Sequence, residues 1–182
     1  YSKKWVDLFY EQEVMQKVEI GHFIKGLHNL LNAHFDLRNY QQFQVVLKQF
    51  EEFARTPIAQ QHDNFRIHTD IYINSARLNW HLMTGTFKEG LGLVSTMANN
   101  LKEYELYVDP HRIVVFYYKF ATLYFGSGDY NTCIDYLQKI INDTFQNMPE
   151  PYLLFSCFFP ANGSIYRLFR YPRYSLPYTK GI

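Results

Sequence analysis

A self-similar pattern recurs three times along the chain and constrains its fold more than any other feature. The three segments are residues 29–53 (NLLNAHFDLRNYQQFQVVLKQFEEF), 76–100 (ARLNWHLMTGTFKEGLGLVSTMANN) and 119–143 (KFATLYFGSGDYNTCIDYLQKIIND). Each contains an apolar run, a short turn, an aromatic residue (Tyr40, Phe87 or Tyr130) and a second apolar run. Recurrence of such a pattern at an interval of about 45 residues is typical of stacked supersecondary units.

The spacing of the apolar residues predicts that these units are helical. Apolar residues recur at steps of three and four, as in Val46, Phe50 and Phe53, which is the period of an amphipathic helix. The alternation expected of strands does not persist anywhere. The predicted helices cover 6–19, 20–36, 41–55, 62–84, 87–105, 111–126 and 130–147. We therefore expect an all-α chain.

The third segment carries a resemblance to the tetratricopeptide repeat family. Ala121 stands at the small position of the first helix and Tyr124 at its aromatic position. Asp129 and Tyr130 fit the turn, and Cys133 takes the small position of the second helix. The resemblance covers about residues 20–147 and implies antiparallel helical hairpins, about three in number, stacked as an α-solenoid over residues 1–148.

The other two segments depart from the family pattern. Leu31 and Leu78 replace the small residue of the first helix, and Phe43 replaces that of the second helix in the first unit, whereas Gly90 keeps the position in the second unit. The period also exceeds the usual length of about 34 residues. The resemblance therefore implies longer helices than the family's own.

The resemblance also implies a binding surface, because first helices line the inner groove in this family. The residues placed there are Lys25, His28, Asn32, Tyr72, Ser75, Asn79, Tyr118 and Thr122. Asn32 and Asn79 match a position where the family often uses asparagine to hold a peptide backbone. Most basic residues of the family's carboxylate clamp are missing, with Lys25 and Lys119 the nearest candidates, so we do not expect recognition of a C-terminal carboxylate. The alternative is that these are ordinary polar residues on exposed helix faces.

The glycine-rich stretch GSGDYN, residues 126–131, does not match a phosphate-binding loop. It lacks both Gly-x-x-x-x-Gly-Lys-Ser/Thr and Gly-x-Gly-x-x-Gly, and a helical run rather than a strand precedes it. We predict a hairpin turn in which glycine ends a helix in the left-handed conformation.

No arrangement of residues points to catalysis, a metal or a cofactor. His22, His28 and His34 are spaced so that each step turns by about 240° on a helix, and His-Glu-x-x-His is absent. Cys133 fits a packing role rather than a nucleophile's. We expect a chain that is not an enzyme and that has no catalytic residue, metal or cofactor.

A compositional break separates residues 149–182 from the body of the chain. No acidic residue follows Glu150, whereas Arg167, Arg170, Arg173 and Lys180 are basic and aromatic residues are frequent. We interpret this irregular basic-aromatic tail as a segment capping the last repeat or as an aberrant terminus. Binding of nucleic acid by the tail is the alternative, disfavoured because the whole chain carries a net charge of only +1.

Together these features predict a non-catalytic scaffold that binds a peptide or helix of a protein partner in a concave groove. The alternatives are the ligand-sensing repeat domain of a larger transcriptional regulator and association of the chain with itself through its aromatic surface. Cysteine usage predicts the cytoplasm, and no apolar run is long enough to span a membrane. The start at Tyr1 rather than methionine suggests a fragment.

Overall fold

The fold of the chain is helical throughout the part that the computed structural model describes, residues 1–147, which belong to one compact unit. These residues contain no strand, which confirms the predicted all-α class. The helices are α1 (Ser2–Glu11), α2 (Glu13–Val18), α3 (Ile20–Asp36), α4 (Tyr40–Ala54), α5 (Pro57–Gln60), α6 (Asp63–Thr84), α7 (Phe87–Leu91), α8 (Val94–Glu103), α9 (Pro110–Ser127) and α10 (Tyr130–Asn147). None of the described helices is long and apolar enough to cross a membrane. The tail predicted from residue 149 lies outside the described residues.

Two predicted helices are interrupted in the structure. The segment predicted as 6–19 forms α1 and α2, separated at Gln12, whose φ and ψ of −127° and 77° are not helical. The segment predicted as 87–105 forms α7 and α8, separated at Gly92 and Leu93. The short helix α5 was not predicted; it begins at Pro57, after Thr56, whose side chain accepts a hydrogen bond from the Ala59 N–H.

The turn between α9 and α10 confirms the interpretation of GSGDYN. Gly128 ends α9 with a φ of +92°, in the left-handed region that favours glycine. Asp129 then caps the next helix, because its Oδ1 accepts a hydrogen bond from the Thr132 N–H at 3.1 Å. The loop therefore reverses the chain between two helices.

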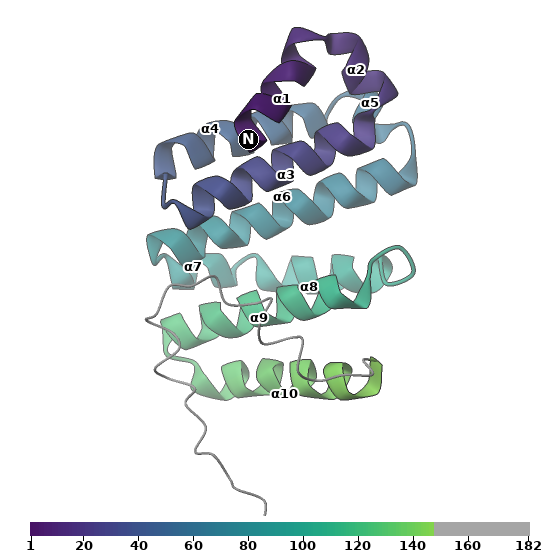
Figure 1. Cartoon of the computed structure of the whole chain (residues 1–182). Coiled ribbons are helices and arrows are strands. Elements are labelled where there is room, and N and C mark those ends of the chain that lie inside the picture. The colour runs from purple at the N-terminus through teal and green to yellow at the C-terminus, as the bar shows by residue number, and fades with distance from the viewer. Residues whose placement is uncertain (148–182) are drawn as a thin grey trace, which may run out of the picture. The chain divides into compact units, whose positions relative to one another are not determined.

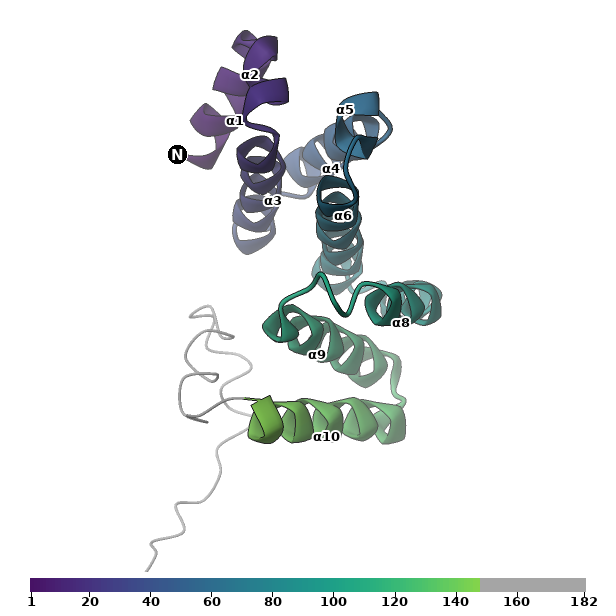
Figure 2. The same ribbon diagram turned by 90° about the vertical axis from the view of Figure 1, so that its right-hand side faces the viewer.

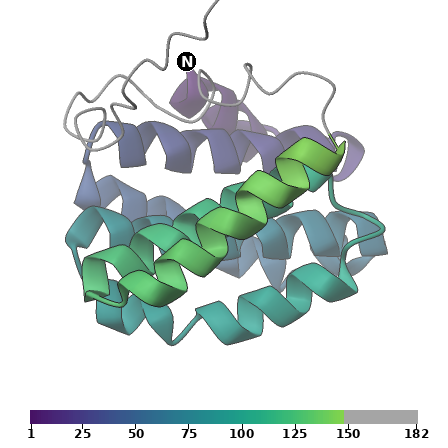
Figure 3. The same ribbon diagram turned by 90° about the horizontal axis from the view of Figure 1, so that it is seen from below.

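The helices pack as sequential neighbours within the unit. Contacts join α3 with α4, α6 with α7 and α9 with α10, and further contacts join α3 with α6 and α6 with α9. Figures 1 and 2 show α3, α6 and α9 following one another through the unit, and Figure 3 shows α10 lying across α9. The three helices α3, α6 and α9 are thus consecutive in space although other helices separate them in sequence.

Large apolar side chains fill the spaces between these helices. Phe43 and Phe50 of α4, Leu31 of α3 and Leu78 of α6 are completely buried, and burying such a side chain stabilises the fold by about 1.5–3 kcal/mol. Leu31, Leu78 and Phe43 are the residues that depart from the small positions of the repeat pattern. Burial explains the departures, because these positions serve as core.

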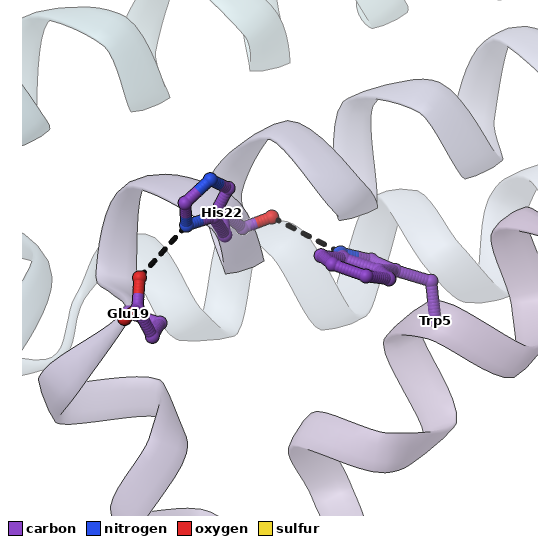
Figure 4. A network of polar contacts seen from close by, with 3 residues as sticks. All are labelled: Trp5, Glu19 and His22. Carbon is purple, nitrogen blue, oxygen red and sulfur yellow. Dashed lines mark hydrogen bonds and ion pairs between the residues drawn. The ribbon is translucent and has the colours of Figure 1, made fainter.

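Helix α1 buries Val6 and Phe9, and its Trp5 lies against the start of α3 (Figure 4). The Trp5 indole Nε1–H donates to the carbonyl oxygen of His22 at 3.5 Å, and His22 Nδ1 lies 2.8 Å from Glu19 Oε2. The indole ring also lies directly over Gly26, where a Cβ atom would come within 2.7 Å of Trp5 Cδ1. Glycine at position 26 permits this close approach.

Gly90 offers a test of how closely α7 approaches its neighbours. A Cβ at this buried position would lie 2.8 Å from Leu123 Cδ2 and 2.9 Å from His81 Cβ. We expect Gly90→Ala to lower the free energy of unfolding by about 1–3 kcal/mol because the packed core must shift. Gly21→Ala is the matched control, since the nearest atom is Phe65 Cε1 at 4.0 Å, and it should be neutral or slightly stabilising. Urea unfolding measures both changes, and equal effects would contradict the close packing of α7.

Candidate binding site

A cavity of about 320 Å³ lies where α3, α6 and α9 meet. Asp109 and His111 line it at the start of α9, and the helix contributes a stripe formed by Arg112, Val115, Phe116 and Lys119. The spacing of these residues places them on one face of the helix. Helix α3 contributes His28 and Asn32, one turn apart, and helix α6 contributes Ile71, Tyr72 and Ser75. This volume lies in the range of small-molecule sites.

Lys119 links α9 to α6 across the cavity. Its Nζ donates to the Ser75 carbonyl oxygen at 3.3 Å and to Ser75 Oγ. Part of the residue remains accessible, but burial of the ammonium group lowers the pKa of Lys119 to about 7, because a low-dielectric setting disfavours the charged form. Lys119 therefore changes its charge close to neutral pH.

Tyr72 joins all three helices at the cavity wall. The His28 ring stacks on it with 4.0 Å between ring centroids and 12° between planes. Arg112 Cζ lies 4.7 Å from the centroid of the Tyr72 ring, and its Nη2 donates to the Tyr72 hydroxyl at 2.8 Å. The ring is thus held by an aromatic contact from α3 and by a cation–π contact and a hydrogen bond from α9.

The two histidines beside Tyr72 are kept neutral. Burial, followed by the charges of Lys119, Arg112 and Lys25, lowers the pKa of His28 to about 3. Burial, followed by the charge of Arg112, also lowers the pKa of His68, whose ring centroid lies 6.1 Å from that of Tyr72. His28 Nε2 lies 3.1 Å from Asn32 Nδ2, so this nitrogen accepts and the ring proton resides on Nδ1.

Four of the eight predicted groove residues line the cavity: His28, Asn32, Tyr72 and Ser75. Lys25 is exposed on α3 and acts on the site through its charge. Asn79 is buried, with 4 % of its surface exposed, and it does not belong to the cavity lining.

The two residues predicted for the groove on α9 do not belong to the cavity lining. Tyr118 and Thr122 lie beside the stripe that faces the cavity, and Thr122 Oγ1 donates to the Tyr118 carbonyl oxygen at 2.8 Å. Lys119 and Arg112 take the lining positions instead. The helical spacing of Arg112, Val115 and Lys119 is the sequence signal for these two cations. The repeat pattern does not contain that spacing.

Within the described residues, no group of three or more His, Cys, Asp or Glu side chains is placed to hold a metal ion. Cys133 is a buried free thiol, and its pKa is raised by burial and by the charge of Asp129. The thiol form is inert as a nucleophile, so Cys133 acts as the packing residue that the sequence indicated.

Comparison of the chain with protein-family models, with curated proteins and with solved structures found no match. The resemblance to the tetratricopeptide repeat therefore stays a prediction based on the three aligned segments.

The lowered pKa of Lys119 predicts a pH dependence of stability. The unfolded lysine keeps its ordinary pKa of 10.5, so between about pH 7 and 10.5 the unfolded chain binds a proton that the folded chain has released. The contribution of Lys119 to the free energy of unfolding therefore rises as the pH rises from about 7 to 10.5. We expect the free energy of unfolding, measured in urea from pH 7 to 9.5, to rise more in the parent chain than in Lys119→Met.

Lys48→Met is the control for this measurement, because Lys48 is exposed on α4. It should keep the slope of the parent chain. An identical slope for the parent chain and Lys119→Met would show that Lys119 is not buried as described.

Proposed function

We propose that the chain is a tetratricopeptide-like array of about three helical hairpins that acts as a non-catalytic scaffold for protein interaction. Its groove, formed by α3, α6 and α9, receives an extended peptide or a helix of a partner protein. The observation that carries the proposal is the cavity at the junction of these three helices, to which four of the predicted groove residues contribute.

The contacts between helices support the array. Each of α3, α6 and α9 contacts the helix that follows it, α3 contacts α6, and α6 contacts α9. In a stack of hairpins, first helices follow one another on one face in this way, and the face they form becomes an extended binding surface.

The polar groups of the cavity suit the main chain of a peptide. Asn32 keeps a second amide hydrogen beyond the one that faces His28, and the Ser75 hydroxyl can donate while it accepts from Lys119. Hydrogen bonds from these side chains would fix the register of the peptide, while apolar atoms of Val115 and Phe116 supply contact area.

A peptide selection tests the proposal. A random peptide library displayed on phage is selected against the full chain, and the binders are titrated against the parent chain and two variants. We expect Asn32→Ala to weaken a groove-bound peptide roughly tenfold, which corresponds to about 1.4 kcal/mol. Gln44→Ala, an exposed change on α4, should leave affinity within a factor of two.

Amide shifts in ¹H–¹⁵N spectra of the parent chain locate the peptide independently of either variant. Perturbations concentrated on α3, α6 and α9 support the groove. Binders that perturb only α4, α8 or α10, or that bind Asn32→Ala as tightly as the parent chain, overturn the proposal.

A further inference from the structure

The two cations of the cavity have only neutral partners. Arg112 donates to the Tyr72 hydroxyl, and Lys119 donates to the backbone and side-chain oxygens of Ser75. Among the described side chains, no carboxylate lies within ion-pair distance of either cation. Arg66 and Arg77 of α6, by contrast, are paired with Asp63 and Glu51.

The remainder of the chain offers few groups that could neutralise these cations. Asp143 and Glu150 are the only acidic residues beyond the described side chains, and residues 151–182 contain none. Asp109 lines the cavity, but it is exposed and caps α9, where its Oδ1 accepts from the His111 N–H at 2.8 Å. The positive charge therefore has no dedicated partner within the described part of the protein.

The charged groups near Lys119 are mostly cationic. Arg112 lines the cavity with it, Lys25 of α3 acts on the same site through its charge, and Asp109 is the one carboxylate in the described lining. The other polar groups are His28, Tyr72 and Ser75, His68 beside Tyr72, and His111. The pKa of His28 is lowered by the positive charges of Lys119, Arg112 and Lys25. These three charges therefore act on the same part of the cavity. Unpaired cations in a partly buried site cost stability, and such groups concentrate where a ligand binds.

We infer that the cavity binds an oxyanion group, a carboxylate or a phosphate, carried by the ligand and held between Arg112 and Lys119. The inference rests on the groove proposed above and specifies what that groove selects. The guanidinium suits either oxyanion because its planar donors match two oxygens at once, and the Lys119 ammonium adds a point charge from the same helix. Asn32 and Ser75 supply neutral donors at the wall.

The cavity is larger than an oxyanion needs, so the ligand must carry more than the charged group. Its volume is about 320 Å³, and Ile71, Val115 and Phe116 provide apolar walls. An acidic or phosphorylated side chain of a peptide and a free organic anion share this chemistry, and the test below separates them.

Isothermal titration of the full chain with sulfate tests the inference, because sulfate keeps its charge over the whole pH range used. Phosphate and acetate form parallel arms, all at constant ionic strength and in two buffers with different enthalpies of ionisation. We expect saturable binding of one sulfate together with proton uptake near pH 7 to 8, since the bound anion raises the pKa of Lys119 above about 7. Affinity should then fall by up to about tenfold per pH unit above that value.

Substitution of each cavity cation tests whether the anion binds in the cavity. Arg112→Gln and Lys119→Met should each weaken sulfate binding at least tenfold, whereas Arg66→Gln and Lys48→Met, which alter exposed cations elsewhere, should change it less than twofold. Far-ultraviolet circular dichroism checks that the variants fold. The proton uptake of the parent chain remains decisive if Lys119→Met does not fold.

The outcomes separate this inference from the proposed function. The inference is overturned if sulfate does not bind, if it binds without proton uptake, or if its binding survives both cavity substitutions. In that case a selected peptide that still binds in the groove continues to support the proposed scaffold. Anion binding with no selectable peptide supports the inference and favours a free organic anion over a peptide. Competition between sulfate and a selected acidic peptide supports both and identifies the peptide as the source of the charge.

Discussion

The contact of Tyr72 with His28 and Arg112 is the interaction on which the candidate site depends. It joins α3, α6 and α9 at one ring, through a stacked pair at 4.0 Å and a cation held 4.7 Å from the ring centroid. Lys119 reinforces the same junction through its hydrogen bonds to Ser75. The cavity thus has walls from three helices whose relative positions are fixed by polar and aromatic contacts as well as by the apolar core.

This junction gathers several buried or partly buried polar groups. Burial keeps His28 and His68 neutral and brings the pKa of Lys119 to about 7, while the Nδ1 atoms of both histidines are buried with no hydrogen-bond partner among the described residues. Burying polar groups and charges without full compensation costs stability. A ligand that supplies negative charge and acceptors would offset that cost, which connects the energetics of the junction to the proposed anion site.

The helical fold could be predicted from the sequence because apolar spacing reports burial directly. Residues 20–36 and 130–147 form helices with the predicted bounds, and the left-handed turn at Gly128 follows from local chemistry. The breaks at Gln12 and Gly92 were missed because apolar spacing continues across both, and a backbone break leaves that spacing unchanged. Leu31, Leu78 and Phe43 were recognised as departures from a family pattern, but their burial is a consequence of tertiary packing.

The site was predictable only in part. The repeat register leads to His28, Asn32, Tyr72 and Ser75, whereas on α9 it selects Tyr118 and Thr122, which do not line the cavity. Lys119 stands in the sequence only as a candidate for a carboxylate clamp, and Arg112 precedes the third aligned segment, so the repeat pattern gives no signal for it.

The central claim, that this junction binds an anion, is tested most directly by the ¹³Cε titration of Lys119 in the full chain, assigned by comparison with Lys119→Arg. We expect the pKa of Lys119 to be about 7 and to rise when sulfate is added. An ordinary lysine pKa, or one that sulfate leaves unchanged, would contradict it.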